Sequence, residues 1–201
     1  MMCHPSLFID KSMPSQLPII EFETKRLICR QWRPSDFPSF ARINADPKVM
    51  EFFPKLLSTL ESNTLAESFK DFTELYGFGL WAVELKESNE FIGFVGLSIP
   101  TIIFPFSPCV EIAWRIGSLY WGQGYATEAA RKTLQIGFEL LELSEIVSFT
   151  TINNLRSRSV MKKLGMQEDY LTFEHPSLPI GHALREHCLY RLQRDQWSKT
   201  I

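Results

Sequence analysis

Alternation of apolar and polar residues predicts the first strands of this chain. Residues 24–32 place Leu27 and Cys29 on one face and Ile28 and Arg30 on the other, which is the two-residue period of a strand. Residues 80–85 and 90–99 predict two more strands, with a turn at 87–89 between them. Residues 91–97 are nearly all apolar, so the second of these strands is expected to be buried on both faces.

Apolar residues at helical spacing predict four helices. The first covers residues 34–44, and the second begins after Ser58, with Glu61 in capping-box position, and runs to about residue 75. A third helix is expected over 125–141, where one stripe holds Ala126, Ala130, Leu134, Phe138 and Leu141. A short helix over 157–164 is expected to end at Gly165.

The remaining strands are predicted at residues 109–116, 146–151, 168–173 and 188–192. The order of elements, β-α-α-β-β-β-α-β-α-β-β, is typical of a single α/β (α+β) domain built around one sheet. Prolines 5, 14 and 18 predict a loosely ordered lead-in over residues 1–20. The domain is then expected over 21–195, with a short tail over 196–201.

Composition narrows the function classes. The chain has 201 residues, sixteen Phe and five Trp, which is enough for one domain with a real core. A net charge of −2 disfavours a nucleic-acid partner, and no apolar run is long enough to predict a membrane span. Four cysteines without a CxxC spacing indicate free thiols in a reducing cytoplasm.

The segment between strand 109–116 and helix 125–141 carries the clearest chemical signal. Gly122 and Gly124 allow a close backbone approach, and the helix N-terminus offers unpaired N–H groups, so an anion such as a pyrophosphate is expected there. A P-loop fits poorly because Gln123 replaces its lysine. A dinucleotide fits poorly because Thr127 replaces the third small residue. Coenzyme A and a purely structural tight turn remain.

Five segments together bear a wider resemblance. In one-letter code they are ETKRLICR at 23–30, GFVGL at 93–97, VEIAWRI at 110–116, WGQGYATEA at 121–129 and NLRSRSVMKKLGM at 154–166. From about residue 24 to 192 the chain resembles the GNAT superfamily of N-acetyltransferases, in particular its RimJ/RimL-like branch, whose members acetylate protein N-termini and small amines. The resemblance implies a central mixed, mostly antiparallel sheet that is splayed in the middle and flanked by helices.

The resemblance also implies acetyl-CoA as the acetyl donor. The loop N–H groups would hold its pyrophosphate, the strand before the loop would pair with its pantetheine arm, and Asn154 would bind that arm. The expected cofactor-binding residues are Ile112, Ala113, Trp114, Arg115, Gly122, Gln123, Gly124, Tyr125, Ala126, Thr127, Asn154, Ser157 and Arg158. Trp121 departs from the Gln or Arg of the general family pattern. The basic group Arg156, Arg158, Lys162 and Lys163 suits phosphates, although a solvated helix face is the alternative reading.

Acetyl transfer to an amine needs a base, because an alkyl ammonium is not nucleophilic. Glu111 is the candidate base, since its apolar neighbours can raise its pKa. A backbone N–H of Ile112 or Ala113 is expected to polarise the carbonyl. The resemblance assigns Ser157 to the leaving thiolate, with Tyr170 or Tyr190 as alternatives. Cys109 has no adjacent histidine, so direct transfer in a ternary complex is favoured over an acyl-enzyme.

The acceptor is less well defined by the sequence. The predicted reaction moves acetyl to a primary amine, either a protein N-terminus or a small molecule; the alternative is a non-catalytic acyl-CoA-binding sensor or partner module. The expected acceptor residues are Phe52, Phe53, Phe106, His175 and His182. The histidine spacings do not predict a metal site. A monomer or a homodimer in the cytoplasm is expected.

Overall fold

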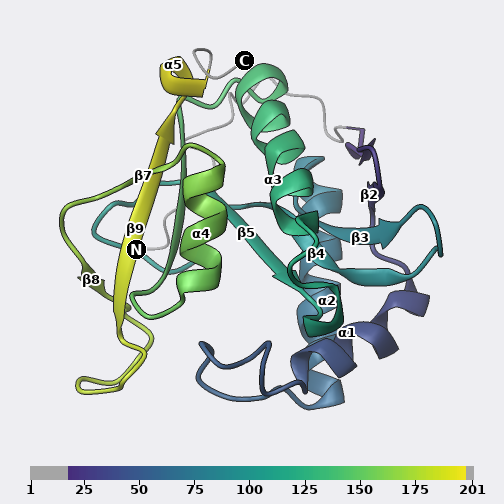
Figure 1. Ribbon diagram of the computed structural model, residues 1–201, viewed down its shortest axis with the longest axis horizontal. Helices are drawn as coiled ribbons and strands as arrows, with labels where there is room; N and C mark the ends of the chain where they lie inside the picture. Colours follow the sequence, from purple (N-terminus) through teal and green to yellow (C-terminus); the bar gives the residue numbers. More distant parts are fainter. Residues whose placement is uncertain (1–17, 198–201) are drawn as a thin grey trace.

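A computed structural model describes residues 18–197 of the chain (Figure 1). The strands are β1 Phe22–Glu23, β2 Leu27–Arg30, β3 Leu80–Leu85, β4 Phe91–Ser98, β5 Glu111–Ile116, β6 Glu145–Thr151, β7 Gln167–Glu168, β8 Phe173–Glu174 and β9 Glu186–Gln193. The helices are α1 Phe37–Asn44, α2 Thr59–Tyr76, α3 Tyr125–Gln135, α4 Leu155–Lys163 and α5 Arg194–Trp197. Single 3-10 turns precede α1 and α3, and a π-helical turn, Ile136–Leu140, continues α3.

One mixed sheet organises the fold, in the strand order β1-β2-β3-β4-β5-β6-β9-β7, with β8 also paired to β9. Every pairing is antiparallel except that of β5 with β6. That parallel pair has a single registered position, Glu111 opposite Val147. The two strands therefore separate beyond this point, and the sheet is splayed in its middle, as the family resemblance implies.

Helices cover both faces of the sheet and bury separate apolar clusters. Ala130 of α3 and Met161 of α4 pack with Ile112 of β5 in the larger cluster. Phe40 of α1 and Ala66 of α2 belong to the second cluster on the opposite face. Figure 1 shows α3 and α4 in front of the sheet, with α4 beside β9 on the far side of the splay from α3.

Several element boundaries differ from the sequence prediction because strand pairing sets them. The expected strand over 24–32 is shortened to β2, Leu27–Arg30, and residues before it form β1, which pairs back on β2 in antiparallel fashion. The expected strand over 168–173 is wrong: β7 and β8 pair with different parts of β9 and leave a gap between them. The fourth helix begins at Leu155 rather than 157, because Asn154 caps it.

The packed domain extends slightly past the expected boundaries. The backbone N–H of Ile20 donates to Gly77, and the Trp81 indole donates to the Ile20 carbonyl at 2.6 Å. At the other end Trp197 is buried and stacks on Phe138, so packing reaches beyond residue 195. The expected lead-in over 1–17 and the tail from 198 lie outside the described residues.

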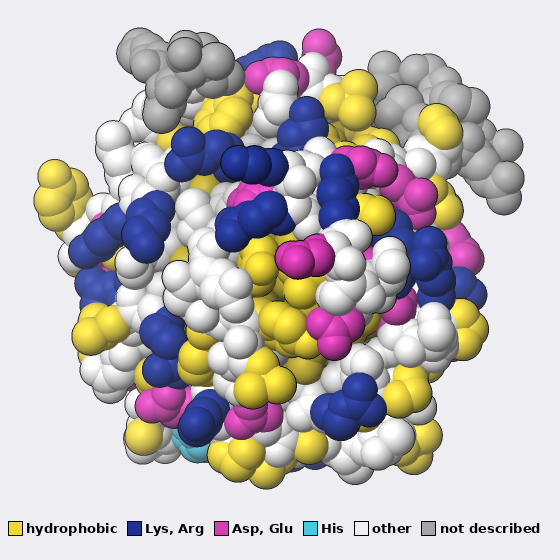
Figure 2. All heavy atoms as spheres, turned by 45° about the vertical axis from the view of Figure 1, so that its right-hand side comes forward, with side chains coloured by type: hydrophobic (Ala, Val, Ile, Leu, Met, Phe, Trp, Pro, Cys, Tyr) yellow, Lys and Arg dark blue, Asp and Glu magenta, His cyan; other side chains and the backbone are white. Residues whose placement is uncertain are grey.

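Surface properties are in line with the near-neutral charge of the chain. Acidic and basic side chains are interspersed on the face drawn in Figure 2. No helix within residues 18–197 is long and apolar enough to cross a membrane.

Candidate active site

The glycine-rich loop turns the chain from β5 into the start of α3. Gly122 and Gly124 have φ values of +78° and +82°, in the left-handed region where a side chain is strained. Gly124 is the N-cap residue of α3, and no side chain caps this helix end. A Cβ at Gly122 would meet no atom within 4 Å. The loop thus presents the first N–H groups of α3 to open space, which suits an anionic ligand.

A carboxylate on α3 fixes the start of this helix against the N-terminal strands. The Glu128 carboxylate accepts hydrogen bonds from the Thr24 hydroxyl at 2.7 Å and from the Arg26 backbone N–H at 2.9 Å. It also pairs with the Arg26 guanidinium at 2.6 Å. Burial raises the pKa of Glu128, but the bonds from Thr24 and Arg26 outweigh this and lower it overall. Thr24 and Arg26, about a hundred positions earlier in the chain, therefore fix the first turn of α3 and the loop that precedes it.

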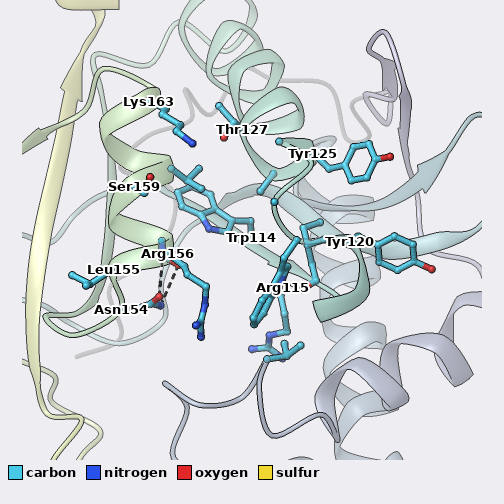
Figure 3. A pocket seen from close by; sticks show the side chains of 18 of the residues that line it. Trp114, Arg115, Tyr120, Tyr125, Thr127, Asn154, Leu155, Arg156, Ser159 and Lys163 are labelled. Carbon is cyan, nitrogen blue, oxygen red and sulfur yellow. Dashed lines mark hydrogen bonds between the residues drawn. The ribbon is translucent and has the colours of Figure 1, made fainter.

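A cavity of about 500 Å³ lies between this loop, β5 and α4 (Figure 3). Its lining residues are Val49, Phe52, Phe53, Trp114, Arg115, Ile116, Tyr120, Trp121, Gly122, Gly124, Tyr125, Ala126, Thr127, Asn154, Leu155, Arg156, Ser157, Ser159, Val160 and Lys163. Figure 3 shows Lys163 and Thr127 facing each other from α4 and α3, with Trp114 between the two helices. Most of the expected cofactor residues are thus brought together around one space.

The N-terminus of α4 forms one wall of this cavity. The Asn154 side chain accepts from the Ser157 backbone N–H at 3.2 Å and donates to the Thr150 hydroxyl at 2.9 Å and the Ser157 hydroxyl at 3.1 Å. Both amide protons of Asn154 and its backbone N–H are engaged, so what its side chain can still offer a ligand is the second lone pair of the amide oxygen. Ser157 receives a bond at Oγ and keeps its own hydroxyl proton to donate.

Basic residues reach the cavity from α4, although not all of those expected. Arg156 and Lys163 line it, and Arg156 lies over the Trp121 ring at 4.5 Å while pairing with Glu51 across the cleft. Arg158 points elsewhere: it pairs with Glu168 at 2.6 Å and donates to the Ile152 carbonyl at 2.7 Å. Helical periodicity explains the difference, since positions 156 and 163 share a face that 158 does not.

A second cavity of about 320 Å³ adjoins the first. Its lining residues are Phe52, Phe53, Pro54, Phe94, Glu111, Ile112, Ala113, Trp114, Arg115, Ser148, Phe149, Ser157, Met161, His175, Ser177, Leu178 and His187. Five of these residues, Phe52, Phe53, Trp114, Arg115 and Ser157, line both cavities. The two spaces therefore meet at β5, where the sheet is splayed.

Glu111 is the carboxylate of the second cavity. Burial raises its pKa to about 8, and it has no hydrogen-bond or ion-pair partner among residues 18–197. A carboxyl group with a pKa this close to neutral is basic enough, once ionised, to take a proton from an amine. The geometry thus places a potential base on β5, next to the first cavity.

Other titratable groups near Glu111 have different properties. Burial raises the pKa of the Cys109 thiol to about 11, so this thiol stays protonated, and Cys109 does not line the cavity. Burial lowers the pKa of His187 to about 4 and that of His175 below its usual value. Within the described part of the chain, no three His, Cys, Asp or Glu side chains gather as a metal site.

Several residues predicted from the sequence lie away from both cavities. Gln123 accepts a bond from the Tyr125 hydroxyl at 3.1 Å, and Phe106 stacks on Phe104. The His182 ring binds the Leu184 backbone N–H. Tyr190 is buried and donates to Glu168, and the Tyr170 side chain is fully exposed. Neither tyrosine reaches the junction where Ser157 lies.

The structure adds residues that the sequence analysis did not single out for the site. These are Val49, Pro54, Phe94, Ile116, Tyr120, Ser148, Phe149, Leu155, Ser159, Val160 and Met161. Segment 49–54 and loop 175–178 come to the cavities only through tertiary packing. For the α4 residues the helical spacing from Ser157 could have indicated Val160 and Met161.

Comparison with known proteins places the chain among acetyltransferases. A family model described as "Acetyltransferase (GNAT) domain" matches residues 26–167. "Uncharacterized N-acetyltransferase YnaD" of Bacillus subtilis is 26% identical over 177 residues, covering 87% of this chain and 98% of that protein. "FsC-acetyl coenzyme A-N(2)-transacetylase" of Aspergillus fumigatus is 33% identical over 131 residues, covering 63% of this chain and 55% of that protein.

Solved structures share the same fold. An acetyltransferase (GNAT family) from Bacillus anthracis aligns with a TM-score of 0.73 at 22% identity, covering 88% of this chain and 99% of that one. The ribosomal-protein-S5-alanine acetyltransferase from Vibrio fischeri aligns with a TM-score of 0.69 at 22% identity, covering 89% of this chain and 98% of that one. With the splayed sheet and the loop at the start of α3, these matches lead to one assignment: the chain belongs to the GNAT acetyltransferase family and is an acetyl-CoA-dependent N-acetyltransferase.

Proposed function

We propose that this protein transfers acetyl directly from acetyl-CoA to a primary amine in a ternary complex, with Glu111 as general base. The observation that carries the proposal is an unpartnered carboxylate of raised pKa in a cavity that joins the cofactor cavity. The protonated thiol of Cys109, away from that cavity, supports direct transfer over an acyl-enzyme.

Acetyl-CoA supplies the acetyl group as an activated thioester. In the transfer, a C–N bond forms, the C–S bond breaks and, for a neutral amine, one proton passes from nitrogen to sulphur. Glu111 takes the proton from the amine, and a free backbone N–H on the splayed edge of β5 donates to the carbonyl oxygen on which negative charge develops. The Ser157 hydroxyl, at the junction of the cavities, donates to the sulphur that leaves.

Residues for the donor are drawn from the first cavity. The N–H groups of the α3 N-terminus, together with Arg156 and Lys163, suit the phosphates, while the exposed edge of β5 beyond Glu111 suits the pantetheine arm. The open space at Gly122 fits a bulky anion. Arg156 and Lys163 thus take the phosphate-binding role that the sequence analysis gave to Arg158, which does not line the cavity.

The acceptor class is proposed more broadly as a protein N-terminus or a small-molecule amine, with Phe52, Phe53 and His175 lining its cavity. Among structures of the same fold, the one from Vibrio fischeri acts on a ribosomal protein, which is in keeping with the proposed RimJ/RimL-like branch. Buried free thiols at Cys29, Cys109 and Cys188 fit the proposed cytoplasmic location, as a monomer or a homodimer.

Thermal unfolding with and without acetyl-CoA, followed by amine acetylation assays, tests this proposal. A hundredfold excess over Kd is expected to raise the free energy of unfolding by about 2.7 kcal/mol, with no rise for NAD. Thiol release with an amine panel then detects turnover. If acetyl-CoA raises the unfolding midpoint but no amine or N-terminal peptide is acetylated, the catalytic role of Glu111 is wrong.

A further inference from the structure

The second cavity contains an arginine that lacks a counter-ion. Arg115 lies on β5 and lines both cavities, and no Asp or Glu within residues 18–197 forms an ion pair with it. Arg30 of β2, which is buried, is by contrast bound by Asp36 at 2.8 Å and by Glu84 at 2.7 Å. Buried cations are normally paired in this way, so the lack of a carboxylate at Arg115 needs an explanation.

The partners that Arg115 does have leave its guanidinium group incompletely satisfied. Nη1 donates to the Asn44 amide oxygen at 2.6 Å, and the group lies over the Phe53 ring at 4.2 Å. Nε is sealed from solvent without a partner among the described residues. Burial lowers the pKa of Arg115 only to about 10, so the group remains charged at neutral pH.

Arg115 lies on the same face of β5 as the proposed base. Side chains alternate along a strand, so Glu111, Ala113 and Arg115 share one face and Trp114 the other. Pairing with β4 agrees, since Arg115 lies opposite Phe94 and contacts its ring at 5.5 Å. Positions 111 and 115 are about 13 Å apart along the strand, with the small side chain of Ala113 between them.

The charges around this cavity leave Arg115 uncompensated. The titratable groups that line it with Arg115 are Glu111, His175 and His187. His175 and His187 have lowered pKa values and are neutral at pH 7, and Glu111 is largely protonated there. The cavity therefore has a net positive charge, which disfavours a polyamine and favours an acceptor that brings its own negative charge.

We propose that the acceptor is a small amine that also carries a carboxylate, such as an amino acid, and that Arg115 binds this carboxylate while Glu111 faces the amine. Guanidinium and carboxylate groups match in shape and charge, so the pair would fix the amine in register with the thioester. This inference rests on the proposed function and narrows its acceptor class.

Three matched acceptors test it: an amino acid, its carboxamide and the amine that its decarboxylation would give, for each of the twenty standard side chains. We expect the protein to acetylate at least one acid with a kcat/KM about ten- to hundredfold above that of its carboxamide, mainly through a lower KM. Equal or better rates with the carboxamide or the bare amine would overturn the inference, as would the absence of acetylation of every acid.

Two variants connect this preference to Arg115. Asn44→Asp places a carboxylate beside the guanidinium without changing shape, and the Ser62 hydroxyl that now accepts from Asn44 at 2.8 Å can donate to it instead. Arg115→Met removes the charge. Both are expected to abolish the preference for the acid, and Asn44→Asp should do so without lowering the unfolding midpoint. Arg42→Met, on the exposed side of α1, is the matched control.

Measuring acetyl-CoA binding distinguishes failure of the acceptor inference from failure of the proposed function. In Asn44→Asp, which leaves the lining of the first cavity unchanged, the rise in unfolding midpoint with acetyl-CoA is expected to match that of the wild type. If Arg115→Met loses this rise, the arginine serves the donor and the inference is wrong. If the wild type itself shows no rise and acetylates no amine, the proposed function fails with it. If the wild type binds and acetylates amines without regard to a carboxylate, only the inference fails.

Discussion

Glu111 and Arg115 are ionisable side chains in an apolar setting, and neither forms an ion pair within residues 18–197. Burial raises the pKa of Glu111 to about 8 and lowers that of Arg115 to about 10, so both shifts oppose the charged form. Elsewhere in the fold, groups such as Arg30 and Asp36 bind each other. Uncompensated groups next to a cavity are typical of functional sites, since their partners arrive with the substrates.

The raised pKa of Glu111 predicts the pH dependence of catalysis. Because a general base must be deprotonated, kcat/KM is expected to fall about tenfold for each pH unit below 8, reaching about a hundredth of its plateau at pH 6. Glu111→Gln is expected to remove this dependence and to lower turnover by at least about a hundredfold. Initial rates from pH 5.5 to 9.5 measure both effects, and an unchanged profile in the variant would exclude Glu111 as the base.

Folding stability gives an independent check on the same pKa. The folded protein holds a proton on Glu111 up to about pH 8, whereas the unfolded chain releases it near 4.5. The free energy of unfolding should therefore fall as pH rises from about 4.5 to about 8, and level off above. Denaturant unfolding of the wild type and of Glu111→Gln should be measured across this pH range. The decrease in the free energy of unfolding between about pH 4.5 and about pH 8 should be smaller in the variant by the contribution of Glu111.

Ser157 is expected to act on the leaving group. Its Oγ accepts from Asn154, so its proton is available at the junction of the two cavities. Ser157→Ala should lower kcat about ten- to a hundredfold and leave the acetyl-CoA affinity within about threefold of the wild type. Steady-state kinetics and binding measure the two. Ser68→Ala, on the exposed face of α2, is the control, and a Ser157→Ala variant with wild-type kcat would contradict the role.

At the level of elements, the start of α3 is positioned by distant residues. The Glu128 carboxylate joins this helix to Thr24 and Arg26 beside β2, so the loop that precedes α3 has a fixed backing. Gly124 is the N-cap residue and has no side chain to cap the helix. The contacts of Glu128 with Thr24 and Arg26 instead hold the first turn of α3 in place. This contact gives a structural role to Thr24 and Arg26 of the segment at 23–30 on which the family resemblance partly rests.

Glu128→Gln is expected to destabilise the fold and weaken donor binding. The variant loses the ion pair with Arg26 and should unfold about 1–3 kcal/mol more easily at pH 7. Since the pKa of Glu128 is lowered in the folded protein, its contribution is present above the unfolded pKa and is lost as pH falls through the folded one. The difference in unfolding free energy between wild type and variant should thus be smaller in acid; a difference that stays constant with pH would contradict this origin.

The elements that could be predicted from the sequence are those whose signal is local. The strand, glycine loop and helix from Glu111 to Gln135 follow from residue periodicity, and so Ile112 and Thr127 do line the cavities. The break between β7 and β8 depends on pairing with β9, which periodicity does not encode. His182 was expected beside His175, but the loop between them turns it away, since loop paths depend on tertiary contacts.

Across the whole molecule, the two cavities of the candidate site lie where the two halves of the sheet separate. The larger apolar cluster packs α3 and α4 on one face, and the smaller packs α1 and α2 on the other. Arg156 of α4 and Glu51 of the segment after α1 form an ion pair across the cleft. Acetyl-CoA, if it contacts both halves of the sheet, should therefore raise the free energy of global unfolding.

The glycine loop provides the last test of this coupling between donor binding and global stability. Gly124→Val and Gly181→Val both force a branched residue to a φ of +82°, so each should lose a similar stability, about 1–2 kcal/mol. Gly181 lines neither cavity, whereas Gly124 lines the one assigned to the donor, and a Cβ there would lie 3.7 Å from the Arg26 guanidinium that fixes the start of α3 through Glu128. Thermal unfolding should show the acetyl-CoA rise in Gly181→Val and not in Gly124→Val. A full rise in Gly124→Val would mean that the phosphates bind away from the N-terminus of α3.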